Sequence, residues 1–495
     1  MRNSLILPAI LMLATSLPVV PATADSLLQV YEKAVRSDPT IREAEANQLA
    51  AREGKPIARG SLLPQISGTA GWQYARSDGT QLLDSDGNPA TPPLILKNKS
   101  SRSETHNWGL QLQQSLFRWD QWIRLDQADR QAAQADVNYQ AAQQDLMVRV
   151  AQAYFDVLAA EDTLGSEQAA KEAFSRQLEQ SNKRFEVGLI AITDVQEAQA
   201  AYDQSVAAEI LAKRTLANTK EALRAIIDEY PGILEKPALD IPLVAPSPAD
   251  EVQWVDTAMR QNRDLIASQI GTEIAKDDVK LARSGHFPTL DFVAAHTDSD
   301  ISGSRVTGLL AGPGSPQVPF ARSPTDSDSA QDSFGLQLSV PIFSGGATSA
   351  KTKQAVYKHR AARERLEQTA RETERQTRDA YLAVLSNISS VKALKQAYES
   401  AKTALKATEA GYEVGTRTSV DVLNSRQAAF TAESKFLRSR YDYLISGLRL
   451  KQAAGTLSEE DLSRIDALLT TTGPLIPAEQ QADPAAPAGD PARRD

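Results

Sequence analysis

The chain has 495 residues, of which 24% are charged and 6% aromatic, and its formal net charge is −9. This mild negative charge, without any dense run of Lys and Arg, argues against a nucleic-acid partner. The absence of cysteine excludes disulfides, thiolate metal sites and a lipid-modified N-terminal cysteine.

The first 24 residues have the pattern of a cleaved signal peptide. Arg2 precedes an apolar run from Leu5 to Val20, and small residues follow at Ala22-Thr23-Ala24. A retained N-terminal helix is the alternative, and Pro8 and Pro18 disfavour it. We therefore predict a signal peptide over residues 1–24 and export of the mature chain. No later segment has the ~18 consecutive apolar residues of a membrane-spanning helix, so any membrane crossing must use strands.

The rest of the chain reads as one pattern written twice. RFEVGLIAITDV, starting at Arg184, returns as GYEVGTRTSVDV, starting at Gly411. In the same order, GLQLQQSLF returns as GLQLSVPIF and AYFDVLAA as AYLAVLS, which indicates a tandem duplication. We predict a first repeat over 25–235, a Pro-rich linker over 236–250 and a second repeat over 251–455. A short helix and a disordered tail are expected over 456–495.

Each repeat contains two segments in which apolar and polar residues alternate. They predict strands at about 62–76, 106–117, 287–296 and 333–343, each with one apolar face. About 9–12 residues are enough to cross a bilayer when a strand is tilted, and a long polar loop joins each pair. A soluble antiparallel sheet gives the same alternation, but long outer loops favour an outer-membrane protein. The aromatic residues near strand ends are candidates for the membrane interface: Trp72, Tyr74, Trp108, Phe117, Trp119 and Phe343.

A long helix is predicted after the second strand of each repeat. No proline occurs between Trp119 and Val187, and apolar residues follow a heptad spacing in both copies. About 65 residues at 1.5 Å each would make a rod of ~100 Å, which must pack against other helices in a bundle or cylinder. Four strands cannot close a barrel in lipid, so several chains must combine their strands.

The repeated phrase predicts the tip of a helical hairpin, near 188 in the first repeat and near 415 in the second. Glycine in Val187-Gly188 and Val414-Gly415 ends a helix with the least steric cost. Thr193-Asp194 and Ser419-Val420-Asp421 then place side-chain oxygens at the start of the returning helix, where backbone N–H groups lack partners.

With these features together, the sequence over residues 27–455 resembles the TolC family of outer-membrane channel-tunnels. The resemblance implies an α+β membrane protein in which duplicated strand and helical-hairpin units form a trimeric twelve-stranded β-barrel, with four strands per chain. A periplasmic α-helical coiled-coil barrel continues it. The implied partners are two further copies of the chain, a periplasmic adaptor protein and an inner-membrane RND or ABC transporter. The implied location is the outer membrane of a Gram-negative bacterium, spanning into the periplasm.

The same resemblance implies roles for residues at the two hairpin tips. Thr193, Asp194, Tyr412 and Arg417 correspond to an entrance latch that holds one hairpin to the other. Asp421 and Asn424 correspond to the pore constriction, where Asn424 replaces an acid and so reduces the expected charge. Adaptor docking is expected at the exposed tips: Val187, Gly188, Leu189, Val414, Gly415 and Thr416.

No catalytic motif, cofactor site or metal-ligand set accompanies these features. The four histidines have no HExxH spacing, and the chain has neither a GxSxG elbow nor a Walker A sequence. We therefore predict a passive exit duct for efflux or type I secretion rather than an enzyme. The alternative is a periplasmic helical-hairpin adaptor or scaffold that does not span a membrane.

Overall fold

The computed structural model describes residues 24–83, 94–310 and 318–470. In chain order its helices and strands are α1 (Leu27–Ser37), α2 (Pro39–Arg52), α3 (Gly54–Gly60), β1 (Gln65–Leu83), β2 (Leu94–Phe117), α4 (Trp119–Glu186), α5 (Ile192–Ile227), β3 (Lys236–Pro237), α6 (Glu251–Gln261), α7 (Arg263–Ser284), β4 (Thr289–Leu310), β5 (Val318–Pro324), β6 (Ser327–Ser339), α8 (Ala347–Glu413), α9 (Ser419–Ala453), α10 (Glu459–Asp466) and β7 (Leu469–Thr470).

The chain divides into two compact units, and each takes segments from both repeats. The first contains residues 1–44, 139–263 and 370–495, and the second contains 45–138 and 264–369. The units therefore cut across the predicted repeats, whose boundaries remain a prediction from sequence. The signal peptide, apart from Ala24, and the tail from Thr471 lie outside the described residues.

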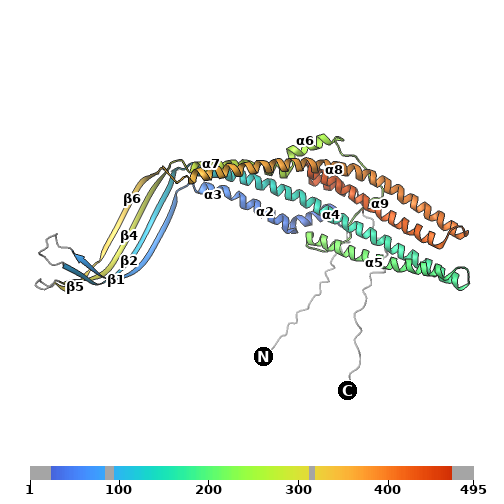
Figure 1. Cartoon of the computed structure of the whole chain (residues 1–495), viewed down its shortest axis with the longest axis horizontal. Coiled ribbons are helices and arrows are strands. Elements are labelled where there is room, and N and C mark those ends of the chain that lie inside the picture. The colour runs from blue at the N-terminus through green and yellow to red at the C-terminus, as the bar shows by residue number, and fades with distance from the viewer. Residues whose placement is uncertain (1–23, 84–93, 311–317, 471–495) are drawn as a thin grey trace, which may run out of the picture. The chain divides into compact units, whose positions relative to one another are not determined.

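The second unit holds an antiparallel sheet in which β1, β2, β4 and β6 lie side by side (Figure 1). β5 pairs with β4 over 304–309 and β6 pairs with it over 289–301, so β5 and β6 form one interrupted column. The β2–β4 pairing joins a strand of the first repeat to a strand of the second. Within the described part of the chain, β1 and β6 each have a strand neighbour on one side only.

The strands are longer than the alternation predicts. β1, β2 and β4 contain 19, 24 and 22 residues, and β6 contains 13 and begins at Ser327 rather than 333. Much of the two predicted polar loops is therefore strand, and β5 was not predicted at all. The alternation ends where apolar side chains end, whereas backbone pairing with a neighbouring strand continues without them.

The register gathers the predicted apolar residues on one face of the sheet. Ile66 lies opposite Leu112, and Leu290 lies opposite Leu338. On β6 the side chains of Leu336 and Leu338 are 67% and 64% exposed in the single chain. A row of uncovered apolar side chains on antiparallel strands is the surface that lipid requires.

An ion pair with a buried carboxylate marks the passage from strand to helix. Arg118, between β2 and α4, donates from Nε to Oδ1 of Asp291 at 3.1 Å and from Nη2 to Oδ2 at 2.9 Å. Asp291 is only 5% exposed and lies on β4, where the β2–β4 register shifts between Ser115 and Phe117. Two parallel hydrogen bonds set the orientation of both partners, so this pair holds the end of β2 against β4.

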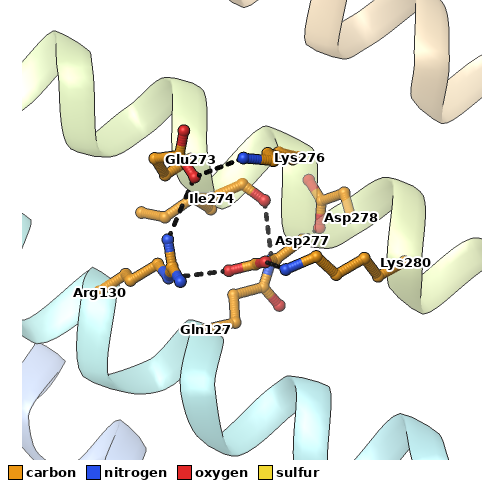
Figure 2. Close-up of polar contacts among 8 residues, drawn as sticks. All are labelled: Gln127, Arg130, Glu273, Ile274, Lys276, Asp277, Asp278 and Lys280. Atoms are coloured by element: carbon orange, nitrogen blue, oxygen red, sulfur yellow. Dashed lines mark hydrogen bonds and ion pairs between the residues drawn. The ribbon is translucent and has the colours of Figure 1, made fainter.

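A polar cluster joins α4 to α7 within the same unit (Figure 2). Asp277 has a side chain that is 2% exposed and lies 3.0 Å from Nε of Arg130 and 2.8 Å from Nζ of Lys280. One turn away on α4, Gln127 donates to Oδ1 of Asp278 at 2.7 Å. Burying one carboxylate between two cations is costly unless both stay in place, so the cluster specifies how α4 and α7 align.

In the first unit, α4 lies beside α5 and α8 lies beside α9 (Figure 1). The predicted long helices are confirmed, with 68 residues in α4 and 67 in α8. Leu146, Val150 and Val157 of the predicted heptad seam are fully buried, as are Tyr154 and Leu158 in the adjacent row. They form one core with residues of α1, α5, α9 and α10, which explains why a helix as long as α4 is stable: its apolar stripe is covered by neighbours.

The predicted linker is tied down along its length. β3 pairs with β7, and Nη1 of Arg440 on α9 donates to the carbonyl of Ala238 at 3.0 Å. Further on, the Tyr443 hydroxyl accepts from the Val244 amide at 3.0 Å and donates to the Val244 carbonyl at 3.1 Å. The connection between the repeats is thus an ordered segment that packs against α9.

Candidate functional site: the paired hairpin tips

Both hairpins turn through the same backbone motif. Gly188 and Gly415 have φ angles of 75° and 80°, in the left-handed region that favours glycine. The Gly188 amide bonds to the carbonyl of Phe185 at 2.9 Å and the next amide to that of Arg184 at 2.9 Å. Gly415 repeats this pattern. These bonds satisfy the last carbonyls of α4 and α8, so the predicted glycine turns are confirmed.

The starts of the two returning helices differ. Thr418 caps α9: its side chain accepts from the Asp421 amide at 3.2 Å, and the Asp421 carboxylate accepts from the Thr418 amide at 3.0 Å. This reciprocal pair is a capping box. The cap position of α5 is Ala191, which has no side-chain hydrogen bond. The prediction that Thr193 and Asp194 cap α5 was therefore wrong, because the helix begins at Ile192, before them.

The two tips are joined within one chain, though not by the predicted pairs. Oγ of Ser419 donates to Oδ1 of Asp194 at 3.1 Å, and Ser419 is 3% exposed. The guanidinium of Arg184 lies 5.0 Å from the centre of the Tyr412 ring, within cation–π distance. No hydrogen bond or ion pair between described residues joins Arg417 to Thr193 or Asp194. Its side chain instead lies against Gly411, whose missing Cβ leaves room for it.

Further contacts above the tips hold α9 against α4. Arg426 donates from Nη1 to the carbonyl of Ala173 on α4 at 3.2 Å, and from Nη2 to Glu409 on α8, within its own hairpin, at 2.5 Å. Nearby Phe174 and Leu423 are buried in one apolar cluster. Two polar side chains in this region of α4 are also buried, Gln177 at 5% exposure and Ser181 at 1%. Gln177 Nε2 and Ser181 Oγ have no hydrogen-bond partner among the described residues.

The two predicted constriction residues lie one turn apart on α9. Asp421 is partly exposed and Asn424 is exposed. The backbone amide and hydroxyl of Thr418 lower the pKa of Asp421 below its ordinary 3.8, with a smaller contribution from the charge of Arg417. Asp421 is therefore a carboxylate at neutral pH, and its charge is partly committed to capping α9.

The residues predicted to dock an adaptor are exposed at both tips. Val187 and Leu189 are 69% and 73% exposed, and Val414 is 75% exposed. Gly188, Gly415 and Thr416 are exposed as well. Apolar side chains at the end of a hairpin do not contribute to its core, so they are available to a partner.

The predicted interface aromatics fall at two levels of the sheet. Trp72 and Trp108 lie inside β1 and β2 rather than at their ends, as does Tyr74, because the strands are longer than predicted. Phe117 ends β2, Trp119 begins α4, and Phe343 follows β6. From Trp108 to Phe117 a strand rises about 30 Å, or ~20 Å along the normal when tilted, close to the ~25 Å apolar band of outer-membrane barrels.

No helix in the described part of the chain is both long enough and apolar enough to cross a membrane. Within the same residues, no cluster of His, Cys, Asp and Glu is arranged to hold a metal ion.

The sequence matches the outer membrane efflux protein family twice, over residues 30–228 and 254–456. It is 37% identical to the outer membrane protein TolC of Vibrio cholerae over 447 residues, covering 90% of this chain and 94% of the relative. The chain belongs to the TolC family of outer membrane efflux proteins. It is also 37% identical to TolC of Escherichia coli K12, over 90% of this chain and 85% of that one. The channel CmeC of Campylobacter jejuni has the same fold, with a TM-score of 0.67, 17% identity and coverage of 95% and 98%.

Family membership confirms the predicted fold class: a trimeric channel of duplicated units, in which a β-barrel is continued by a helical tunnel. It also confirms the location in the outer membrane, reaching into the periplasm, and the function as an exit duct. The family is one of transport channels, so the alternative of a periplasmic scaffold is wrong.

Sequence reasoning missed Ser419 and Arg184 as contacts between the tips. Both lie in the repeated phrase, but the prediction from that phrase used the positions that match between the two repeats. Ser419 aligns with Ile192 in the first repeat and Arg184 with Gly411 in the second. Positions where the copies differ are those expected to make unlike contacts between hairpins.

Proposed function

We propose that the chain is the outer-membrane duct of a tripartite machine, with a periplasmic adaptor and an inner-membrane RND or ABC transporter as its partners. The observation that carries this proposal is the exposure of apolar side chains at both hairpin tips, which belong to one compact unit. These side chains are Val187, Leu189 and Val414. An adaptor would cover these apolar side chains. Transport through the duct is passive, so the proposal assigns no catalytic residue and no cofactor.

The names of the relatives include both protein secretion and efflux. The alkaline protease secretion protein AprF of Pseudomonas aeruginosa is 29% identical over 90% of this chain. The proteins called TolC are more similar, at 36–37% identity. We assign selection of the cargo to the transporter, because the duct offers the same passage to small molecules and to unfolded protein.

We assign the latch to the contacts between the tips, Asp194 with Ser419 and Arg184 with Tyr412. Each is an exchangeable polar contact, so a few of them hold the hairpins together without fusing them. The other two predicted latch residues, Thr193 and Arg417, lie next to these contacts in the sequence, and we retain them as part of the proposed latch. Asp421, repeated by the trimer, would form a ring of three carboxylates that favours cations, with Asn424 adding no charge.

Site-directed cross-linking tests the docking proposal. The chain has no cysteine, so single cysteines in place of Leu189 and Val414 would be the only thiols. After addition of a short bifunctional cross-linker to intact cells, both variants should be captured with a periplasmic adaptor. Ile57→Cys, 73% exposed on α3, is the control and should not be. Equal capture at all three positions, or none at the tips, would contradict the proposal.

A further inference from the structure

The start of α8 carries cations that the fold itself does not use. Between Asp332 and Glu364 the chain has no acidic residue, and this stretch contains Lys351, Lys353, Lys358, Arg360 and Arg363. All five are exposed, and none forms a hydrogen bond or ion pair with another described residue.

This basic segment lies directly beyond the lipid-facing strand β6. Ile342 and Phe343, between the strand and the helix, are 93% and 88% exposed. Thr348 on α8 lies against Gly285, where an added Cβ would come within 3.1 Å of its methyl group. Gly285 precedes β4 by only a few residues. The start of α8 is therefore level with the beginning of β4 and the end of β6.

The distances place the first two cations at the depth of lipid headgroups. At 1.5 Å per residue, Lys351 and Lys353 lie about 6 Å and 9 Å along the axis from Ala347. The headgroup layer beneath the hydrocarbon core is ~5–8 Å thick, and a lysine side chain extends several ångströms toward it. Arg360 and Arg363 lie about 20 Å and 24 Å along the axis, beyond that layer.

The equivalent start of α4 has a different composition. Trp119 and Trp122 are 47% and 54% exposed there, and Arg124 is paired with Asp120 at 3.7 Å. Aromatic rings and cations are the two kinds of side chain that anchor proteins at a membrane surface. The duplicated chain thus has an aromatic anchor at one strand–helix junction and a cationic one at the other.

We propose that Lys351 and Lys353 bind the phosphate groups of anionic phospholipids in the periplasmic leaflet of the outer membrane. The two side chains lie about 160° apart, on nearly opposite sides of α8, so they cannot both point directly into the lumen of a single-layered cylinder. Ile342 and Phe343 contact the acyl chains just above. This inference rests on the channel fold and not on the docking of an adaptor.

Lipid selectivity measures this contact. The full-length trimer is reconstituted into vesicles of phosphatidylcholine containing spin-labelled phosphatidylglycerol or spin-labelled phosphatidylcholine, and the immobilised fraction of each label is compared. Each cation near an anionic headgroup is worth about a fivefold preference at low salt. Lys351→Gln combined with Lys353→Gln should lower the preference for phosphatidylglycerol several-fold. The matched control, Arg360→Gln combined with Arg363→Gln, removes the same charge and should leave it unchanged.

Three results would overturn the proposal. One is an equal preference in both double variants and the original chain. Another is an equal loss in both variants, which would indicate only a general effect of net charge. The third is an unchanged lipid preference together with a shift in reversal potential or a loss of binding to purified peptidoglycan, which would place the lysines in the pore or against the cell wall. None of these results depends on whether the tips dock an adaptor.

Discussion

Gln177 is a buried amide beside the contacts that hold the two hairpins together. Its Nε2 has no partner among the described residues, and neither has Oγ of Ser181 one turn further on. A buried polar group without a hydrogen bond costs about 1–3 kcal/mol. The packing of the two hairpins in one chain therefore includes a cost that is relieved when water reaches these side chains.

Replacing Gln177 with leucine should stabilise this packing. The variant removes the unpaired amide and keeps most of the volume, so we expect a gain of about 1 kcal/mol. Hydrogen exchange of the amides around Phe174 and Leu423 should slow by about fivefold. Gln180→Leu, at an exposed position of the same helix, is the control and should leave these rates unchanged. Faster exchange in the Gln177 variant would show that the amide has a partner in solution.

The capping box at Thr418 predicts a dependence on pH. Thr418 lowers the pKa of Asp421, so the folded state favours the carboxylate over the acid. The stabilisation is then complete above the ordinary pKa of 3.8 and is lost as the pH falls through the lower folded value. Exchange protection at the start of α9, corrected for intrinsic rates, should fall below pH 4. Thr418→Ala removes the hydroxyl and keeps the backbone amide, so it should cost about 1 kcal/mol at neutral pH and reduce this dependence without abolishing it. An unchanged pH profile in that variant would rule out the capping contribution.

At the scale of elements, the contacts between hairpins distinguish two accounts of the latch. The resemblance pairs Arg417 and Tyr412 with Thr193 and Asp194, whereas the single chain pairs Ser419 with Asp194 and Tyr412 with Arg184. Tyr412→Phe keeps an aromatic ring over which Arg184 can lie, so this substitution removes little of the observed contact.

We expect Ser419→Ala combined with Tyr412→Leu to loosen the entrance. Ser419→Ala removes the contact from α9 to the first hairpin, and Tyr412→Leu removes the contact from α8. The two contacts together are worth about 1 kcal/mol. Single-channel conductance in planar bilayers should rise. Ser425→Ala is the matched control, because Ser425 bonds to Thr408 within its own hairpin at 3.2 Å. A larger rise with Arg417→Ser alone than with the double variant would favour the pairing from the resemblance, formed between neighbouring subunits.

The strand pairs show what could be predicted for an element and what could not. Alternation located β1, β2, β4 and β6 and their apolar face correctly, since the period of two follows from the backbone of any strand. It did not locate their outer ends. Beyond the apolar band, apolar and polar residues no longer alternate, although the backbone still pairs with the neighbouring strand. It also did not locate the pairing of β2 with β4, which depends on the chain that returns between them.

At the scale of the whole molecule, the two faces of the sheet should differ in tolerance to charge. Leu336 lies on the apolar face and Gln337 on the opposite one. Leu336 is level with Gln114, inside the band from Trp108 to Phe117, so Leu336→Arg should cost about 2–4 kcal/mol, whereas Gln337→Arg should cost little. The yield of trimers extracted from outer membranes, compared with total protein, checks this. Equal yields for the two variants would contradict the assignment of the lipid-facing side.

The need for several chains follows from the unpaired edges of the sheet. β1 and β6 are the two edges of the described sheet, and unpaired backbone groups at an edge are costly in hydrocarbon. One chain cannot satisfy both edges, whereas a ring of chains pairs each β6 with the next β1. This requirement, and the family that confirms it, are independent of any particular side chain.

By itself, the sequence determined the duplication, the four strands, the two long helices and the glycine turns at Gly188 and Gly415. Each of these depends on local periodicity or on the conformational freedom of one residue, and both are visible in a short stretch of chain. Only the tertiary structure decided that Ser419 bonds to Asp194, 225 residues away, and that Arg184 lies over Tyr412. Such contacts depend on how the long hairpins align, and that alignment is set by packing along their whole length.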